Sequence, residues 1–322
     1  MKSVPLWNVG GLFLTLALAT SVLWVPALRG KLGAPATEAA PATAEPLEDH
    51  SGHRIPRATY ARIASLSTVA DELLLELCEP DRVVAFTGYS ARSSEKRFRF
   101  QGKPTIEGKA DLEKVLALHP DLVLVSRIGD PRPFERMRDA GLLVYDLGEM
   151  RGLRTLVPNI SEVAAILGHP ERGDRFARAL VAQMGAVGAD LPRSSRKRGL
   201  YLSVYGGRLY GGGVGTSYHD VLTSAGLVDA ADGYNDWPEY SVEEILGRDP
   251  EVIVTNDWMR PRICEHSGLG SLRACASADG IVALDNALLG DPGPAMLDAA
   301  AAVRFAVYGA PQTELATKGK GP

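Results

Sequence analysis

The chain has 322 residues, of which 45% are hydrophobic and 23% charged, and its formal net charge is −4. These ordinary fractions exclude a wholly disordered chain, and the length is sufficient for two domains with buried cores. The first 31 residues contain Lys2, Arg29 and Lys31 but no acid, so the remainder carries a net charge of −7. That negative charge argues against nucleic acid or an acidic membrane surface as a partner.

An uncharged apolar run covers residues 9–28. It is long enough to span a bilayer, so residues 1–31 are predicted to be either a signal peptide or an uncleaved membrane anchor. No cysteine follows the run closely, which argues against a lipoprotein. Residues 32–57 are rich in Ala, Pro, Thr and Glu, a composition that predicts a flexible linker. We interpret His50 and His53 as solvated linker residues rather than metal ligands.

Strand and helix patterns alternate in residues 58–154, which predicts an N-terminal lobe with a mostly parallel sheet. The predicted strands are 62–67, 82–88 and 142–147, and the predicted helices are 69–78 and 131–140. Ligands gather at the carboxyl ends of parallel strands. The loops at those ends offer Tyr89, Arg92, Glu107 and Arg127.

Residues 170–191 have apolar side chains at three- and four-residue steps between Pro170 and Pro192, the period of a helix with one buried stripe. Such a helix would span roughly 30 Å. We predict that residues 155–191 are linker helices, with this one joining two lobes. A helical hinge resists bending, so we expect small lobe closure.

The regions on either side of this helix contain a repeated unit, residues 113–126 and 243–256. Each copy predicts a short amphipathic helix, a turn marked by Pro120 or Pro250, and a buried strand rich in β-branched residues. Two similar lobes explain the repeat most simply, although such a unit can also recur by chance in an α/β protein.

The second lobe, residues 192–309, contains a glycine-rich turn at 211–215 that precedes a predicted helix. The turn lacks the lysine of a P-loop and the glycine spacing of dinucleotide sites, but free backbone N–H groups at a helix start suit an anion. Capping of the helix by Thr216 or Ser217 is an equally simple explanation. Ser217, His219 and Asp220 do not form a triad pattern.

Aromatic loops follow in the same lobe and carry Tyr234, Trp237, Tyr240 and Trp258. Aromatic side chains at the rim of a cleft favour a large planar or apolar ligand. Downstream, residues 310–322 are predicted to be a disordered tail.

The chain has three cysteines. Cys78 ends an apolar helix and is predicted to be buried. Cys264 and Cys275 bracket a loop and could form a disulfide in an oxidising compartment, but the sequence does not supply the geometry.

The ordered set of these motifs, from about residue 57 to 309, resembles the class III solute-binding proteins of ABC importers for cobalamin, ferric siderophores and haem. The resemblance rests on RIASLS, LEKVLALHPDLVLVS, NISEVAAILG, SVEEILGRDPEVIVTN and the Gly293-Pro294 pair. It implies an α/β fold of two Rossmann-like lobes with mostly parallel sheets, bridged by one long α-helix. It also implies that one glutamate on each lobe, here Glu113 and Glu243, docks on the membrane permease. Alternatively, both are ordinary acids of a helix start.

The resemblance further implies that Trp237 lines the cleft and that Tyr89 faces it from the other lobe. Two positions depart from the family. Glu107 stands where cobalamin binders have a second tryptophan, and Ile106 stands where haem binders have a tyrosine, which weakens haem as the ligand. A free-metal site could use only His219, Glu107 and Asp291.

We therefore predict a periplasmic, non-enzymatic, monomeric binding protein that captures a metal chelate, cobalamin or a ferric siderophore, without a cofactor or metal of its own. It could remain tethered to the inner membrane by residues 9–28. Anions of the ligand would meet Arg92, Arg127 and the turn at 211–215. The alternatives are a haem or free-metal receptor, a membrane-anchored sensor, or an enzyme that uses residues 211–217. The predicted ligand-binding residues are Tyr89, Arg92, Glu107, Arg127, Ser217, Tyr218, His219, Trp237, Tyr240, Trp258 and Asp291.

Overall fold

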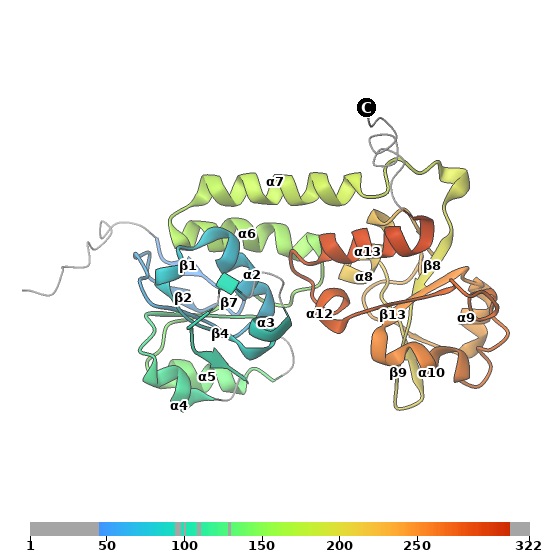
Figure 1. The fold of residues 1–322 in the computed structure, drawn as a ribbon. Helices are drawn as coiled ribbons and strands as arrows, with labels where there is room; N and C mark the ends of the chain where they lie inside the picture. Colours follow the sequence, from blue (N-terminus) through green and yellow to red (C-terminus); the bar gives the residue numbers. More distant parts are fainter. Residues whose placement is uncertain (1–44, 94–97, 100, 108–110, 128–129, 310–322) are drawn as a thin grey trace, which may run out of the picture. The chain divides into compact units, whose positions relative to one another are not determined.

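Two parallel sheets form the centres of two α/β lobes in the computed structural model (Figure 1). The N-terminal sheet has the strand order β5-β4-β3-β6-β7, and the C-terminal sheet has the order β11-β8-β13-β14. All neighbouring strands within these two sheets are parallel. The structure describes residues 45–93, 98–99, 101–107, 111–127 and 130–309. The predicted fold class is confirmed.

The N-terminal lobe alternates strands with helices because buried β-branched runs are separated by capped amphipathic segments. Ser67, for example, caps the N-terminus of α2 by accepting a hydrogen bond from the backbone N–H of Ala70. The elements of this lobe are β3 (Ile63–Ser65), α2 (Thr68–Leu77), η1 (Pro80–Arg82), β4 (Val83–Thr87), α3 (Gly88–Ser93), β5 (Thr105–Ile106), α4 (Leu112–Ala117), β6 (Leu122–Val125), α5 (Arg132–Asp139) and β7 (Val144–Asp146). Helix α3 replaces the loop that was predicted to carry Tyr89 and Arg92.

The C-terminal lobe adds a three-stranded antiparallel sheet, in the order β12-β10-β9, to its parallel sheet. Its elements are η3 (Arg193–Ser195), β8 (Arg198–Tyr201), β9 (Ser203–Tyr205), β10 (Arg208–Tyr210), α8 (Ser217–Ser224), β11 (Val228–Asp229), β12 (Glu239–Tyr240), α9 (Val242–Arg248), β13 (Val252–Asn256), η4 (Asp257–Met259), α10 (Arg260–Glu265), α11 (Arg273–Ala276), β14 (Ile281–Leu284), α12 (Asn286–Leu289) and α13 (Met296–Tyr308). A disulfide joins Cys264 to Cys275, whereas Cys78 is free and buried.

Both copies of the repeated unit fold as predicted, as helix α4 followed by strand β6 and as helix α9 followed by strand β13. Each strand occupies the same place in its sheet, beside the first strand of the lobe. The residue before each proline is left-handed, His119 at φ 46° and Asp249 at φ 41°. The sequence repeat therefore corresponds to a structural repeat.

Two helices connect the lobes, α6 (Leu153–Leu167) and α7 (Pro170–Ala186), and they lie side by side (Figure 1). Helix α7 also contacts α8 and α13 of the C-terminal lobe. Leu180 and Met184 are buried as the predicted stripe requires. The helix ends at Ala186, earlier than predicted, and a turn follows in which the N–H of Ala189 donates to the carbonyl oxygen of Ala186 and that of Leu191 to the carbonyl oxygen of Gly188. A Cβ atom on Gly188 would lie 2.6 Å from the nitrogen of Gly226, so this turn packs closely on the C-terminal lobe.

The predicted flexible linker is wrong for residues 45–57, which begin with a hairpin of β1 (Leu47–Glu48) and β2 (Arg54–Ile55). Asp49 organises the turn by accepting hydrogen bonds from the backbone N–H groups of Ser51 and His53. The same buried carboxylate forms an ion pair with Arg138 at 2.8 Å. His50 and His53 are exposed, as predicted, and His50 Nε2 lies 3.2 Å from Glu162 Oε2.

The predicted signal or anchor segment, residues 32–44 of the predicted linker and the predicted tail at 310–322 lie outside the described residues. Within the described residues, no helix combines the length and the apolar character needed to cross a bilayer.

Candidate functional site

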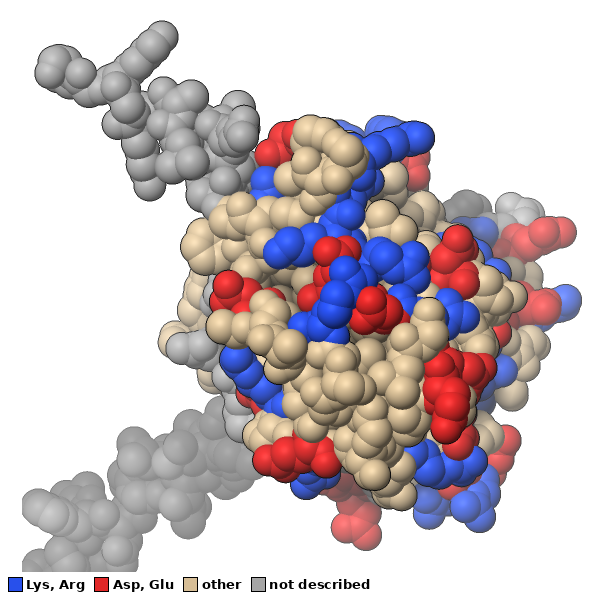
Figure 2. All heavy atoms as spheres, turned by 90° about the vertical axis from the view of Figure 1, so that its right-hand side faces the viewer, with Lys and Arg blue, Asp and Glu red and all other residues tan. Residues whose placement is uncertain are grey.

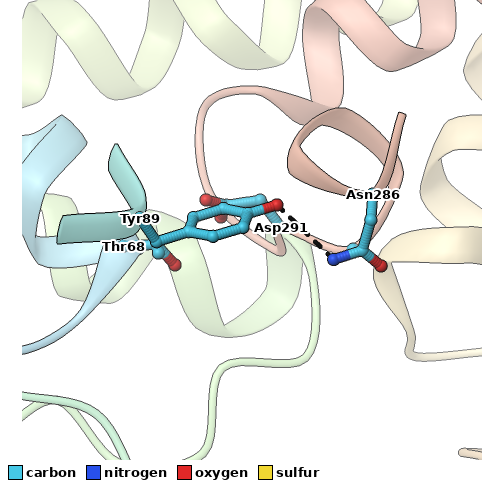
Figure 3. Close-up of a pocket in the computed structure, with 5 residues that line it drawn as sticks. Thr68, Tyr89, Asn286 and Asp291 are labelled. Carbon is cyan, nitrogen blue, oxygen red and sulfur yellow. Dashed lines mark hydrogen bonds between the residues drawn. The ribbon is translucent and has the colours of Figure 1, made fainter. Parts of the chain in front are cut away.

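A cavity of about 240 Å³ lies where residues of the two lobes meet (Figure 3). Its wall is formed by Thr68 and Tyr89 from the N-terminal lobe and by Asn286, Gly290 and Asp291 from the C-terminal lobe. The structure thus brings together two predicted site residues that are more than two hundred positions apart in the sequence, Tyr89 and Asp291.

Tyr89 is positioned by helix α3, which begins where strand β4 ends. Its hydroxyl oxygen accepts a hydrogen bond from Asn286 Nδ2 at 3.4 Å (Figure 3). Partial burial raises the pKa of Tyr89, and the nearby carboxylates of Asp285, Asp291 and Asp257 raise it further. The phenol therefore faces an acidic wall of the C-terminal lobe.

Asp291 lies beside the N-terminus of α2 and is almost completely buried. One carboxylate oxygen accepts a hydrogen bond from the backbone N–H of Gly293 at 2.7 Å, and the Thr68 side chain also bonds the carboxyl group. Burial raises the pKa of Asp291 to about 6. Asp291 therefore joins the two lobes at the back of the cavity.

Large aromatic side chains of the C-terminal lobe remain exposed, Tyr205 at 51%, Trp237 at 42% and Trp258 at 44%. Trp258 follows the carboxyl end of β13 and makes an edge-to-face contact with Tyr205, with ring centroids 5.7 Å apart. The guanidinium of Arg151 lies 5.1 Å from the ring of Trp237. Exposed aromatic rings held by such contacts are suited to bind a planar or apolar ligand.

Sequence reasoning missed Tyr205 and its neighbour Tyr210 as candidate site residues. They flank the glycine pair at 206–207, which turns β9 into β10, and their rings lie 6.4 Å apart. Alternate residues of a strand point to the same face of a sheet. If the sequence had been interpreted as a hairpin, this alternation could have placed Tyr205 and Tyr210 together on one face.

The prediction that Tyr240 binds ligand is wrong, because its side chain is only 4% exposed. It packs edge to face on Tyr234 and belongs to the core of the C-terminal lobe. A Cβ atom on Gly211 would lie 2.2 Å from this ring, so the glycine is needed for the packing.

The backbone N–H groups expected to be free at the turn 211–215 are largely engaged. Those of Gly211, Gly213 and Val214 donate to the carbonyl oxygens of Pro238, Asp236 and Tyr234 at 2.8 to 2.9 Å, which argues against an anion site there. Thr216 is the N-cap of α8, as the simpler alternative predicted. Ser217 is buried, and Tyr218 stacks on Tyr201 with ring centroids 3.5 Å apart, so neither presents a ligand-binding group.

His219 is engaged within its own lobe. Its Nδ1 lies 2.6 Å from Asp229 Oδ2, and this hydrogen bond raises the pKa of the imidazole above its ordinary value. His219 does not converge with Glu107 or Asp291. Among the residues that the structure describes, no group of three or more His, Cys, Asp or Glu side chains could hold a metal ion.

Besides Tyr89, three residues of the N-terminal lobe were predicted to bind the ligand: Arg127, Arg92 and Glu107. Arg127 does not extend freely toward a ligand, because its guanidinium donates to Asp146 at 3.1 Å and to the carbonyl oxygen of His50 at 2.9 Å. Arg92 belongs to α3, but its side chain lies outside the described residues. Glu107 is exposed, and its carboxylate lies against Gly88 at the start of α3.

Glu113 and Glu243 occupy equivalent places in the two lobes. Each is the second residue of its helix, α4 or α9, and each side chain is exposed. Asp111 caps the first helix and Ser241 caps the second. The structure therefore presents one accessible carboxylate at the first turn of each repeated helix.

The surface of the C-terminal lobe shown in Figure 2 has acidic and basic side chains interspersed. Ion pairs of this lobe include Arg208 with Glu239 and Arg273 with Asp249. In the described part of this face, opposite charges alternate rather than forming one large basic area, in keeping with the net charge.

Residues 63–310 match the family model described as periplasmic binding protein. The chain is 27% identical to the vitamin B12-binding protein of Salmonella typhimurium over 198 residues, which cover 60% of this chain and 71% of that relative. It is 26% identical to the vitamin B12-binding protein of Yersinia pestis over 209 residues, which cover 63% and 71%.

Solved structures give the same fold. The periplasmic heme-binding protein of Roseiflexus sp. RS-1, in apo form, is similar with a TM-score of 0.64 and 25% identity, covering 77% of this chain and 97% of that chain. The periplasmic vitamin B12-binding protein of Vibrio cholerae is similar with a TM-score of 0.58 and 24% identity, covering 77% and 96%.

Proposed function

The chain belongs to the periplasmic binding protein family, and from this premise we propose that it captures a metal chelate and delivers it to an inner-membrane ABC permease. Cobalamin is the first candidate and a ferric siderophore the second. The relatives named for vitamin B12 and heme support this class of ligand.

The observation that carries the proposal is the set of exposed aromatic rings at the strand ends of the C-terminal lobe, together with the cavity beside Tyr89. Covering about 100 Å² of apolar surface contributes roughly 2.5 kcal/mol. Two or three such rings therefore supply much of the binding free energy of a large planar ligand. A cavity of about 240 Å³ is too small for a whole chelate, so it would receive one peripheral group.

The charges around the cavity favour cobalamin over haem. The carboxylates of Asp257 and Asp285 act on Tyr89, and Asp291 closes the cavity. An acidic wall attracts hydrogen-bond donors such as the side-chain amides of cobalamin, and it repels the carboxylates of haem. We expect cobalamin to bind more tightly than haem.

Delivery would use Glu113 and Glu243, one on each lobe. Their exposure at equivalent helix starts supports docking of both lobes on arginines of a symmetric permease. We propose that the protein acts as a monomer, which analytical ultracentrifugation of the full chain would test.

We further propose that the protein is exported and that binding involves no chemistry. Burial of Ser217 and the bond between His219 and Asp229 argue against an enzyme at the glycine-rich turn. The hydrophobic core includes residues of α2, α6, α7, α8 and α13, which supports a stiff hinge and small closure. N-terminal sequencing of the protein recovered from the periplasmic fraction would show whether residues 9–28 are retained as a tether.

The test is a calorimetric titration of the full chain with cobalamin, a ferric siderophore and haem. We expect saturable one-to-one binding of cobalamin, weaker binding of haem, and a loss of roughly 30-fold in cobalamin affinity, about 2 kcal/mol, for Trp258→Ala or Trp237→Ala. Phe305→Ala is the matched control, because Phe305 is an exposed aromatic residue of α13 rather than of the aromatic loops. If none of the three compounds binds, the proposed ligand class is wrong.

A further inference from the structure

Asp71 is a carboxylate of helix α2 that lies inside the N-terminal lobe, with no exposed surface. Burying a carboxylate without a cationic partner costs free energy, and hydrogen bonds to the carboxylate offset that cost. Its described partners are hydroxyl and amide groups of Ser65, Thr87 and Ser90. Burial raises the pKa of Asp71 to about 7.

Thr87 connects Asp71 to helix α3. The backbone N–H of Thr87 donates to the carboxylate of Asp71 at 3.2 Å, and the Thr87 hydroxyl donates to the same oxygen. The Thr87 hydroxyl oxygen in turn accepts a hydrogen bond from the backbone N–H of Ser90 at 3.2 Å. Asp71 thereby fixes the orientation of the hydroxyl that caps the first turn of α3.

In the chain, Tyr89 lies between Thr87, whose hydroxyl oxygen accepts the capping hydrogen bond, and Ser90, whose N–H donates it. Gly88 and Ser90 are buried, so the first turn of α3 is held on its inner side while Tyr89 points into the cavity. The bond between Tyr89 and Asn286 of the opposite lobe depends on where this turn lies.

We propose that Asp71 is a positioning residue that holds helix α3, through Thr87, so that Tyr89 is presented to the ligand and to the opposite lobe. The cobalamin readout of this inference rests on the proposed function, whereas the placement of α3 does not. Asp71 itself does not touch the ligand.

The C-terminal lobe contains a second carboxylate in the same kind of role. Asp220 is four residues after the N-cap of α8, as Asp71 is four residues after the N-cap of α2. Its Oδ2 accepts a hydrogen bond from the backbone N–H of Leu153 at 2.7 Å, at the start of α6. Each lobe therefore uses the same helix position to hold the N-terminus of another helix.

The first measurement is hydrogen–deuterium exchange of the full chain without ligand, read at residues 88–91. Asp71→Asn and Thr87→Val should each speed exchange there about tenfold. Thr87→Val removes the hydroxyl that accepts from Ser90, and Asp71→Asn replaces one carboxylate oxygen with an NH2 group that cannot accept from Thr87. Thr87→Ser retains the hydroxyl and should restore the wild-type rate. Asp220→Asn is the matched control and should leave residues 88–91 unchanged.

The second measurement is the cobalamin affinity of the same proteins and of two Tyr89 variants. Asp71→Asn should weaken cobalamin binding about tenfold, and the double variant Asp71→Asn/Tyr89→Ala should bind no more weakly than Tyr89→Ala alone. Additive losses, or exchange at α3 unchanged in both Asp71→Asn and Thr87→Val, would overturn the inference. If the wild type does not bind cobalamin, the proposed function fails on that ligand, while the exchange data still decide the placement of α3.

Discussion

The two lobes share a scaffold but differ in the elements and aromatic side chains that they add to it. In the N-terminal lobe, Asp121 accepts hydrogen bonds from the backbone N–H groups of Ala61 and Arg62, and in the C-terminal lobe Glu251 accepts one from Arg198. The side chain of Arg62 donates to the carbonyl oxygen of Leu118, just after α4, and the side chain of Arg198 donates to that of Arg248, the last residue of α9. These bonds tie each repeated helix–strand unit to the first strand of its own sheet.

The differences lie beyond that unit. The C-terminal lobe adds the antiparallel sheet and the exposed rings of Tyr205, Trp237 and Trp258, whereas the N-terminal lobe contributes Tyr89 on a short helix. The comparison teaches that the repeated part holds the strands in place, while the non-repeated part carries Tyr89 and the exposed rings of the proposed binding surface.

The largest expected effect concerns docking, where the two lobes should behave alike. Glu113→Ala and Glu243→Ala should each reduce cobalamin uptake by roughly tenfold, and the double variant should abolish it, because a charge-assisted contact is lost at each lobe. Cobalamin affinity of the isolated protein should not change. Uptake measured with the matching permease checks both statements, and a strong loss for one lobe only would break the equivalence.

The next effect is the pH dependence of stability, to which a buried carboxylate in each lobe contributes. Because the pKa of Asp71 is raised in the folded protein to about 7, its contribution to stability is present at low pH and is lost as the pH rises from about 4 to 7. Asp71→Asn should remove this loss. The free energy of unfolding of the wild type relative to the variant should therefore fall by on the order of 3 kcal/mol between pH 4 and pH 8.

Urea unfolding at several pH values measures this difference. The pKa of Asp220 is also raised, mainly by burial, so Asp220→Asn should show a change of the same sign. A difference between wild type and Asp71→Asn that is constant with pH would contradict the assignment of a raised pKa to Asp71.

A smaller effect should separate the two acids of the repeated unit. Asp121→Ala removes two hydrogen bonds to the first strand and should destabilise the protein by about 2 kcal/mol, whereas Glu251→Ala removes one and should cost about 1 kcal/mol. Denaturant midpoints of the two variants provide the comparison. Equal midpoints would show that the second bond of Asp121 contributes nothing.

Local patterns allowed the scaffold to be predicted from the sequence. The units ending in β6 and β13 follow from a proline, an amphipathic helix and β-branched residues that are close together in the chain. The solvent exposure of individual side chains could not be predicted from such local patterns. Trp237 and Tyr240 stand three residues apart, yet the first is exposed and the second is buried against Tyr234.

Other features depended on partners that are distant in sequence. Arg127 was predicted to bind anions, but Asp146 and the hairpin at residues 47–55 occupy its guanidinium. The hairpin itself is held by Arg138 through Asp49, a contact that its Ala- and Pro-rich surroundings do not indicate. A local pattern cannot reveal such long-range bonds.

The central claim is that a chelate lies between the two lobes and contacts both. Hydrogen–deuterium exchange of the full chain with and without cobalamin tests it most directly. We predict slower exchange both at residues 88–91, around Tyr89, and at residues 257–259, around Trp258. Protection confined to one lobe, or centred on the turn at residues 211–217, would contradict the account.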